Sequence, residues 1–571
     1  MEISPIVREL LRKRDVCSEA DVLEFLSQAP KLTYDPFLLK DMEEATDLIK
    51  AHLEKGSKIC IYGDYDTDGI TSVTLMLTAL SKVTDKLSYY IPSRFGEGYG
   101  LNKDAVAKIK EAGADLIITV DCGSLSVEEV ELAKSLGMDI IVTDHHTITD
   151  KQADCILLNP KRPDDSYPFD GLAGVGVAFK LVQALTRKGI IPKSVISEVI
   201  DLVAIGTIGD IMPLLGENRT IVKYGMKEIK KGNRAGLKAL MNAAAISPEK
   251  LTSENIAFGI VPRLNAAGRM ADASLGVKLL IDDDGLANSG ISEGAKEKAP
   301  SKAELAIKLN RCNDNRKTLQ EETFEACVKQ IEEEMAASGK TEPDDAIILY
   351  AGKAHEGITG IVAGKLKDKY NRPTMIVTDI DEDGTMLKGT GRSIEGVNLY
   401  ELLKTGEDLF VKFGGHKGAC GFSLPAESLE TLRERVLAEM KRLKDIDARL
   451  LEKKSCAEMT LGLRDVSLEL ARQLELLAPF GEGNPAPLFA LEGLTLSDVR
   501  FVGDGTHAKF TASQPGSRYV QCMLFARAKE CKELATGTGK VDIEAAVEEN
   551  YFNGNTYLQL IVKEIKEHID G

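Results

Sequence analysis

Short apolar runs that alternate with helix-like segments place the strongest constraint on the fold of this chain. Five β-rich runs follow one another: KICIYG (58–63), LSYYIP (87–92), DLIITV (115–120), MDIIVT (138–143) and CILLNP (155–160). Helix-like stretches such as ITSVTLMLTALSKV and SVEEVELAKSLG lie between them. Apolar strands that alternate with helices are typical of parallel sheets covered on both faces. The pattern therefore predicts an α/β fold with a doubly wound, mainly parallel sheet.

The chain has 571 residues, so we expect several domains rather than one. After Gly216 the sequence is predominantly helical, and the charged stretch 301–339 has few helix breakers, which predicts one long connecting helix. A second α/β segment follows, and five short β runs beyond Lys454 suit a small β-barrel of the OB type. The predicted domains are an N-terminal helical segment (1–40), a core (41–216), its helical extension (217–300), the connecting helix (301–339), a second α/β domain (340–448) and the barrel (449–571).

Composition restricts the compartment and the partners. Ten cysteines without a CxxC pair argue against a zinc ribbon or a disulfide framework and indicate a reducing cytoplasm. No apolar run is long enough to predict a membrane span, and the first residues do not resemble a secretion signal. The net charge of −17 repels DNA at long range. A nucleic-acid enzyme of this composition must therefore gather Lys and Arg along one groove, helped by bound metal cations.

Acidic and imidazole side chains follow three of the predicted strands at the point where each strand ends. The first strand is followed by three aspartates, the third by one, and the fourth by an aspartate and two histidines: Asp64, Asp66, Asp68, Asp121, Asp144, His145 and His146. The carboxyl ends of parallel strands meet at one crevice, so we expect these side chains to lie together. Burying so many carboxylates without cations is strongly unfavourable. The sequence therefore predicts a divalent-metal site.

Alternatives for these residues differ in strength. A single aspartate after a strand is more often a helix N-cap. DYDTDG opens like an EF-hand loop, but its twelfth position is Leu75 rather than Glu, and the segment follows a strand where an EF-hand requires a helix. Carboxylate and imidazole ligands together suit Mn²⁺ or Mg²⁺ better than structural zinc. A pair of ions bridged by one carboxylate serves phosphodiester hydrolysis in many enzymes, and Asp121 is the predicted bridge. Asp210, after the apolar run DLVAIGTIG, supplies a further ligand or else only ends a helix.

The order GDYDTDG, VDCG, TDHH and GDIMP resembles the four motifs of the DHH phosphoesterases, which take their name from the triplet Asp144-His145-His146. The rest of the chain resembles the RecJ family in particular. The segments that carry this resemblance are IPSRFGEGYGL (91–101), PRLNAAGRM (262–270), HEGITGIVAGKLKDKYNRPTMIVT (355–378), GRSIEG (391–396), GGHKGACGF (414–422) and APFGEGNPAPLF (478–489). The resemblance implies a DHH core, a DHHA1 domain and an OB-fold domain.

The resemblance also implies roles for individual residues. It assigns two ions, Mn²⁺ or Mg²⁺, to Asp66, Asp68, Asp121, His145 and Asp210. Asp64 becomes a supporting acid, and His146 becomes a phosphate contact that stabilises developing charge; with Asp121 they form the predicted catalytic set. Donors to DNA phosphates are expected at Arg94, Arg269, Arg392, Ser393 and His416. Each arginine could equally form a surface ion pair, and GGHKGACGF in isolation could be a turn with a solvent-facing histidine.

The implied activity is 5′→3′ hydrolysis of single-stranded DNA to mononucleotides, in DNA recombination and repair. Polarity follows from the resemblance alone. Single-stranded DNA, a single-strand-binding protein and a RecQ-type helicase are the implied partners of a cytoplasmic monomer that does not bind membranes. Six aromatic residues of the barrel are candidates for base stacking or for barrel core: Phe501, Phe510, Tyr519, Phe525, Tyr551 and Phe552. The alternatives are a DHH oligoribonuclease or phosphoadenosine phosphatase, which the additional domains disfavour, and a non-catalytic replication scaffold, which the complete ligand set disfavours.

Overall fold

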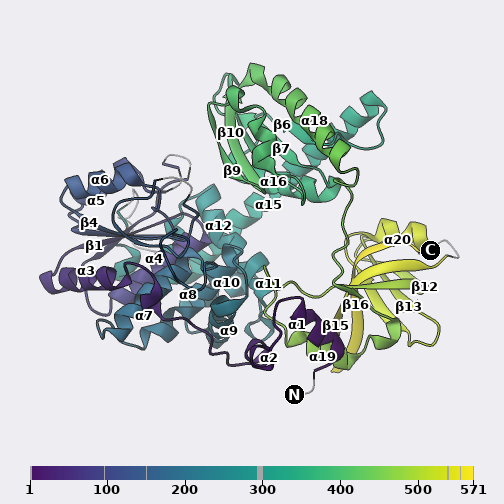
Figure 1. The fold of residues 1–571 in the computed structure, drawn as a ribbon, viewed down its shortest axis with the longest axis horizontal. Helices are drawn as coiled ribbons and strands as arrows, with labels where there is room; N and C mark the ends of the chain where they lie inside the picture. The colour runs from purple at the N-terminus through teal and green to yellow at the C-terminus, as the bar shows by residue number, and fades with distance from the viewer. Residues whose placement is uncertain are drawn as a thin grey trace. The chain divides into compact units, whose positions relative to one another are not determined.

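A computed structural model describes residues 3–94, 97–98, 100–148, 151–291, 300–535, 539–552 and 554–569. The chain divides into two compact units, each of which combines segments that are distant in sequence (Figure 1). The first unit contains Met1–Asn265, Ala273–Ile307 and Ser455–Gly571, and the second contains Ala266–Asp272 and Lys308–Lys454. Among the described residues, no helix has both the length and the apolar character needed to cross a membrane.

The first unit is built on a five-stranded sheet in the order β2-β1-β3-β4-β5, in which every neighbouring pair is parallel. Its strands are β1 (Ile59–Gly63), β2 (Leu87–Tyr90), β3 (Leu116–Val120), β4 (Asp139–Thr143) and β5 (Ile156–Leu158). Each strand falls within one of the five predicted runs, which confirms the parallel α/β class. The chain adds β2 on one side of β1 and β3 on the other. This reversal creates a switch point at the carboxyl ends of β1 and β3, where open sheets of this kind bind ligands.

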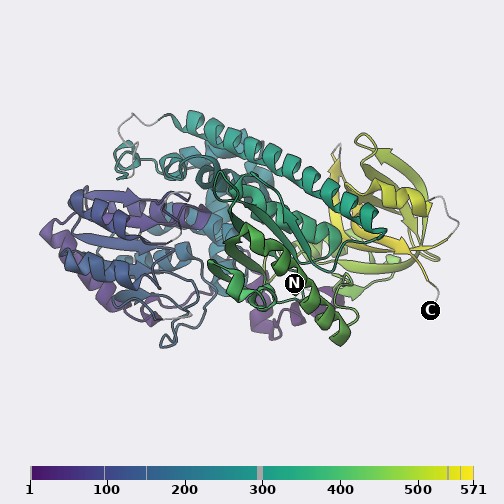
Figure 2. The same ribbon diagram turned by 90° about the horizontal axis from the view of Figure 1, so that it is seen from above.

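Helices cover both faces of the sheet (Figure 2). On one face, α5 (Lys103–Glu111) and α6 (Val127–Ser135) share a core with alternate residues of the strands. On the other face, α4 (Thr67–Leu80) packs on β1 and α7 (Gly174–Arg187) packs on β3 and β4. Nearly every residue of α4 is buried, because α8 (Val195–Gly209) and α13 (Ser274–Leu280) cover its outer side. The aspartates at the start of α4 are therefore held in rigid surroundings.

Further helices of this part pack on α7, α8 and α13. The helix α3 (Met42–Lys55) packs on α7, α9 (Gly216–Lys231) packs on α8, and α10 (Ala235–Ala243) and α14 (Asp284–Ala287) pack on α13. The π-helical turn η3 (Ile256–Ile260) leads into α12 (Val261–Met270). The π-helical turn packs against α8, and Val261 just after it lies against the last turn of α8. The predominantly helical character predicted after Gly216 is confirmed.

Five strands near the C-terminus form a closed barrel, which confirms the predicted OB-type fold. The strands are β12 (Phe489–Val502), β13 (His507–Ser513), β14 (Val520–Leu524), β15 (Val541–Phe552) and β16 (Asn555–Glu567). They follow the order β12-β13-β14-β16-β15, and pairing of β15 with β12 closes the circle. Phe510 is a core residue with 1% exposure, whereas Phe501, Tyr519, Phe525 and Tyr551 are exposed. The side chain of Phe552 lies outside the described residues.

The N-terminal helices belong to the core of this barrel, although they are distant from it in sequence. Leu10 and Leu11 of α1 (Pro5–Arg12) and Phe25 of α2 (Glu19–Leu26) are buried in one cluster with the barrel residues. Just beyond α1, Arg14 forms a nearly buried ion pair with Glu458, at 2.7 Å between Nη1 and Oε2. The helix α19 (Leu468–Glu475) contributes to the same core. The first residues of the chain therefore stabilise its last domain.

The second unit contains most of the long helix and the second α/β domain, both of which were predicted. The helix α15 runs from Lys302 to Ser338, 37 residues. The sheet has the order β6-β7-β8-β10-β9, with β6 (Ile347–Tyr350), β7 (Thr374–Asp379), β8 (Met386–Arg392), β9 (Lys412–His416) and β10 (Ala419–Pro425). α15 and α16 (Glu356–Tyr370) share one core with this sheet, and α17 (Leu399–Lys404) and α18 (Leu429–Ile446) share another.

Candidate active site

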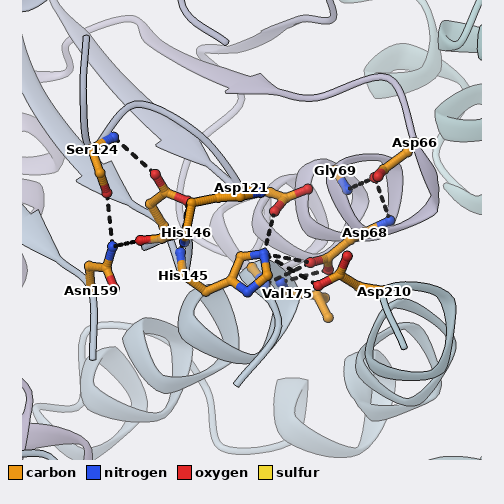
Figure 3. A network of polar contacts seen from close by, with 12 residues as sticks. Asp66, Asp68, Gly69, Asp121, Ser124, His145, His146, Asn159, Val175 and Asp210 are labelled. Atoms are coloured by element: carbon orange, nitrogen blue, oxygen red, sulfur yellow. Dashed lines mark hydrogen bonds and ion pairs between the residues drawn. The ribbon is translucent and has the colours of Figure 1, made fainter. Parts of the chain in front are cut away.

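Two of the three aspartates after β1, Asp66 and Asp68, lie at the start of α4 (Figure 3). Asp64 follows the strand directly and is 3% exposed. Asp66 is the N-cap of α4, and its Oδ1 accepts hydrogen bonds from the backbone N–H groups of Asp68 and Gly69 at 3.0 and 3.1 Å. The N-cap role expected for a single aspartate thus applies to Asp66, and it leaves the second carboxylate oxygen available for another ligand.

The carboxylate of Asp68 is held by the N-terminus of another helix. Its Oδ2 accepts from the N–H of Gly174 at 2.7 Å and its Oδ1 from the N–H of Val175 at 2.9 Å. These donors open α7, so the helix dipole also favours the charged form. Nevertheless, burial and the nearby carboxylates of Asp210 and Asp66 raise the pKa of Asp68 well above its usual value. The site therefore concentrates negative charge beyond what the backbone donors compensate.

Asp121, the residue directly after β3, lies at the centre of the group. Its backbone has a φ of +63°, a conformation that few non-glycine residues adopt. Gly174 faces it so closely that a Cβ at position 174 would lie 2.5 Å from both Cβ and Oδ1 of Asp121. Position 174 therefore requires glycine, because any larger residue would displace the carboxylate of Asp121.

His145, after β4, points its Nε2 at three carboxylates. The distances from Nε2 are 3.2 Å to Asp121 Oδ1, 3.4 Å to Asp210 Oδ2 and 3.9 Å to Asp68 Oδ2. Burial and the neighbouring imidazole of His146 lower the pKa of His145 to about 3. The ring is thus neutral at physiological pH, the form in which histidine binds metals. Asp210 is the C-cap of α8, so it ends that helix as one of the two expectations had it, and its carboxylate also reaches this group; its role as a metal ligand stays a prediction.

Buried polar atoms without a hydrogen-bond partner converge here. They are Asp64 Oδ1, Asp121 Oδ1, Asp210 Oδ2 and His145 Nε2. Burial and the charge of Asp66 raise the pKa of Asp64 to about 8 and that of Asp210 to about 7. Leaving such atoms unsatisfied costs several kcal/mol, about 1–3 for each neutral group and more for a charged one. Divalent cations would satisfy these atoms and neutralise the carboxylates, so the residues fit metal binding.

The candidate ligand atoms form three groups that share residues. One group is Asp64, Asp66 and Asp121, a second is Asp68, His145 and Asp210, and a third is Asp121, His145 and His146; within each group the ligand atoms lie within 4.8 Å of one another. Asp121 Oδ1 also lies 3.2 Å from His145 Nε2, so this carboxylate adjoins both the first and the second group. Two groups that adjoin one carboxylate are compatible with a pair of ions, and the role of Asp121 as their bridge stays a prediction.

Asp144, the first residue of the triplet, has a role that the sequence did not reveal. Its carboxylate accepts from the N–H groups of Ser124 (2.9 Å), His145 (2.7 Å) and His146 (3.1 Å), and it pairs with Nδ1 of His146 at 2.7 Å. Burial alone would raise its pKa, but the hydrogen bonds from His146 and Ser124 hold the pKa of Asp144 well below its usual value. Asp144 is therefore a charged residue that positions both histidines.

His146 forms the solvent-facing side of the centre. Its side chain is 43% exposed, whereas those of Asp68, Asp121 and His145 are 1%, 3% and 4% exposed. Burial lowers the pKa of His146, but the bond to Asp144 outweighs this and raises it above its usual value. Asn159 fixes the same loop, because its Nδ2 donates to the carbonyl of His146 and to Ser124 Oγ, both at 2.9 Å (Figure 3).

Two further residues that the sequence did not single out hold the start of α4. Asn265 Oδ1 accepts from both the N–H and the Oγ1 of Thr67 at 2.8 Å. Gly174 provides the close approach described above. Asn265 belongs to PRLNAAGRM, one of the segments that carry the family resemblance, but no role could be assigned to Asn265 or Gly174 from the sequence, because their contacts arise only once α7 and α12 pack beside α4.

Of the predicted phosphate-binding residues, Arg94 belongs to the first unit. Its guanidinium lies over the ring of Tyr65, 5.2 Å from the centroid, and its charge is a minor influence that lowers the pKa of Asp64. Arg94 is thus the one of the five predicted donors that the structure places beside the acidic centre within a single unit.

The other four donors belong to the second unit. Ala419 pairs across β10 with Arg392 on one side and His416 on the other, so these two residues share one end of the sheet. Ser393 follows Arg392, and its Oγ donates to the carbonyl of Val397 at 2.8 Å. Arg269 donates through Nη1 to the carbonyl of Gly357 in the first turn of α16, at 2.7 Å.

Three segments of the chain match family models: residues 58–207 match the DHH family, N-terminal domain, residues 344–442 the DHHA1 domain, and residues 457–564 the RecJ OB domain. Together with the acidic centre, these matches define the class as DHH-type proteins. The chain is 36% identical to the single-stranded-DNA-specific exonuclease RecJ of Bacillus subtilis, over 99% of this chain and 68% of that protein. It is 32% identical to the RecJ of Salmonella typhimurium, over 99% of this chain and 96% of that protein. The chain therefore belongs to the RecJ family of single-stranded-DNA-specific exonucleases.

The solved structures agree with this assignment. A crystal structure of RecJ from Thermus thermophilus in complex with Mn²⁺ matches all of this chain and 79% of that chain, with a TM-score of 0.78 and 28% identity. The Mg²⁺ complex from the same organism matches all of this chain and 78% of that chain, with a TM-score of 0.72 and 27% identity. Relatives that match almost the whole of this chain are thus named as exonucleases, which favours the predicted activity over the two alternatives.

Proposed function

We propose that this chain hydrolyses the phosphodiester bonds of single-stranded DNA from the 5′ end, releases mononucleotides, and serves DNA recombination and repair. The observation that carries the proposal is the convergence of four buried, unpartnered ligand atoms in a chain of the RecJ family. Oxygen and imidazole ligands suit Mn²⁺ or Mg²⁺, the two ions with which the RecJ relative was solved.

Five residues are assigned to the two ions. Asp66, Asp68, Asp121, His145 and Asp210 would provide the ligands. Asp64 supports the group that contains Asp66, and its unpartnered Oδ1 is free to contribute directly. When bound, such ions lower the pKa of a coordinated water and neutralise charge on a phosphoryl oxygen.

The chain's own residues supply orientation and a proton-bearing donor. The neutral ring of His145 offers the lone pair of a ring nitrogen to a metal ion and does not repel the ion with a positive charge. Asp144 holds His146 through Nδ1, which fixes the orientation of the ring and favours its protonated form. From its exposed position, His146 can donate through Nε2 to an oxygen of the scissile phosphate and stabilise the charge that develops there.

Binding of the strand is assigned to cationic and aromatic side chains. Arg94 and the group of Arg269, Arg392, Ser393 and His416 bind phosphates, including that of the 5′ end. The exposed aromatic residues of the barrel, among them Tyr519 and Phe525, stack on bases. The proposed setting is the cytoplasm, with the chain as a monomer that works beside a single-strand-binding protein and a RecQ-type helicase.

Digestion of 5′- and 3′-labelled single strands with Mn²⁺, beside a duplex, tests the proposal. We expect the 5′ label to appear as a mononucleotide from the start and the duplex to remain intact. The Asp121→Ala variant should be inactive, and Asp383→Ala, which removes an exposed aspartate of the second unit, should be active. Faster turnover of a dinucleotide than of the long strand, or loss of the 3′ label first, would contradict the proposal.

A further inference from the structure

The residue that follows the metal ligand Asp210 has an unusual backbone conformation. Ile211 has a φ of +56°, and among the described non-glycine residues with positive φ it is the one that is β-branched. In this left-handed region a Cβ crowds the following carbonyl oxygen, at a cost of about 1–2 kcal/mol. A β-branched residue there is an outlier for which a functional reason is to be sought.

The strain arises from the way α8 ends. The N–H of Ile211 donates to the carbonyl of Ile208 at 3.2 Å, and the N–H of Met212 donates to that of Thr207 at 3.1 Å. This pair of bonds is the Schellman motif, which places the residue after the C-cap in the left-handed region and normally selects glycine. The helices α5, α6 and α7 end with the same pair of bonds and have Gly113, Gly137 and Gly189 at that position.

Packing does not explain the isoleucine. Its side chain is 69% exposed, so burial repays little of the strain. Replacement by glycine would remove the strain and leave both hydrogen bonds in place, because both are made by the backbone. The chain thus has an exposed apolar side chain at a position where the backbone conformation favours glycine.

The location of Ile211 suggests what its side chain contacts. Asp68, Asp121 and His145 form the buried floor of the centre, whereas the side chains of Asp210 and His146 are 27% and 43% exposed. Asp210 and His146 therefore form the part of the centre that faces solvent. Ile211 is the neighbour of Asp210, with its Cα about 3.8 Å along the backbone from that of the aspartate. Its exposed side chain thus belongs to the residue next to a solvent-facing carboxylate of the centre.

We infer that Ile211 is a substrate-contacting residue whose side chain packs against the base of the nucleotide that adjoins the scissile phosphate. The inference rests on the proposed function, and it goes beyond it by assigning a base contact to a residue outside the ligand set. Such a contact is apolar and independent of base identity. Stacking of bases on apolar side chains supplies this kind of recognition.

Ala245 offers a matched control. It has a φ of +55° and ends α10 with the same pair of bonds, from Ala245 N–H to Asn242 at 3.1 Å and from Ile246 N–H to Met241 at 2.9 Å. The variants Ile211→Gly and Ala245→Gly therefore relieve the same backbone strain, and only the first removes an apolar side chain beside the centre. Ile211→Val retains a β-branched apolar group.

The experiment compares steady-state digestion of a normal single strand with that of a strand whose first two nucleotides are abasic. We expect Ile211→Gly to raise KM for the normal strand about tenfold with kcat little changed, since a contact equal in ground and transition states is lost. On the abasic strand Ile211→Gly and the parent chain should have the same KM. Ile211→Val and Ala245→Gly should resemble the parent on both strands, and neither glycine variant should melt below it.

Two results would overturn the inference: an unchanged KM for Ile211→Gly on the normal strand, or an equal loss on both strands. Equilibrium binding of the normal and the abasic strand to the parent and variant proteins in EDTA measures the base contact in the absence of cleavage. Absence of cleavage by the parent chain would overturn the proposed function, whereas the binding comparison would still decide the role of Ile211.

Discussion

A single methyl group at position 174 should inactivate the enzyme without unfolding it. A Cβ there would lie 2.5 Å from the Cβ of Asp121, whereas carbon atoms in contact are best separated by about 3.5–4.0 Å. Asp121 must therefore move by about 1 Å, and it cannot do so by rotating its carboxylate alone, because the clash includes its Cβ. Misplacement of a reacting group by about 1 Å can cost roughly 10²-fold in rate.

The effect of Gly174→Ala on stability should be small by comparison. Alanine is better than glycine in a helix by about 1 kcal/mol, and Gly174 is the first residue of α7. Overpacking costs about 1–3 kcal/mol, so the net change in the free energy of unfolding should be within about 2 kcal/mol. The chain should remain folded with its metal centre distorted.

The assay is kcat for a labelled single strand with Mn²⁺, together with the melting temperature. Gly176→Ala, one half-turn along α7, is the matched control, since the three nearest atoms that its Cβ would meet outside the helix backbone all belong to the side chain of Leu172, at 3.2 to 3.7 Å. We expect Gly174→Ala to lower kcat about 100-fold or more and Gly176→Ala to change it about twofold at most. Activity of Gly174→Ala within twofold of the parent would refute the proposed position of Asp121.

Three other perturbations give distinct results. Asp144→Asn removes the charge that raises the pKa of His146, so kcat should fall and the pH dependence of kcat should shift to lower pH. An unchanged pH dependence would show that Asp144 does not set the protonation state of His146. Asp64 and Asp210 have folded-state pKa values of about 8 and 7, above the usual value, so the folded metal-free chain binds more protons than the unfolded chain. The free energy of unfolding of the chain in EDTA should therefore fall as pH rises from about 4 to about 8. Mn²⁺ should raise the melting temperature more at pH 8 than at pH 6. A free energy of unfolding that rises with pH in EDTA would contradict these pKa shifts. Leu10→Ala, in the core shared by α1 and the barrel, should lower the free energy of unfolding by about 2–5 kcal/mol and make the barrel more sensitive to proteases. Leu23→Ala, at an exposed position, should change neither property. Equal protease resistance of the two variants would refute the shared core.

The sequence was sufficient to predict the sheet and most of the centre for local reasons. Each strand of the first sheet is a short apolar run, and parallel strands necessarily bring their carboxyl ends together. Asp64, Asp121 and His145 therefore meet although they are distant in sequence. The same reasoning works for the barrel, whose strands are short and regularly spaced.

What the sequence did not reveal depends on contacts between distant segments. Leu10 and Leu11 could have served any core, and nothing near them indicates that they join a barrel more than 450 residues later. Gly174 is required only because α7 begins against Asp121. The strain at Ile211 follows from how α8 ends, and the positioning role of Asp144 from the close approach of Ser124.

Anomalous diffraction from a crystal grown with Mn²⁺ tests most directly whether the strand-end residues hold two cations. We predict two peaks beside Asp121, one near Asp64 and Asp66 and the other near Asp68, His145 and Asp210. The absence of manganese from this cluster, with the carboxylates turned away from one another, would contradict the assignment of the active site.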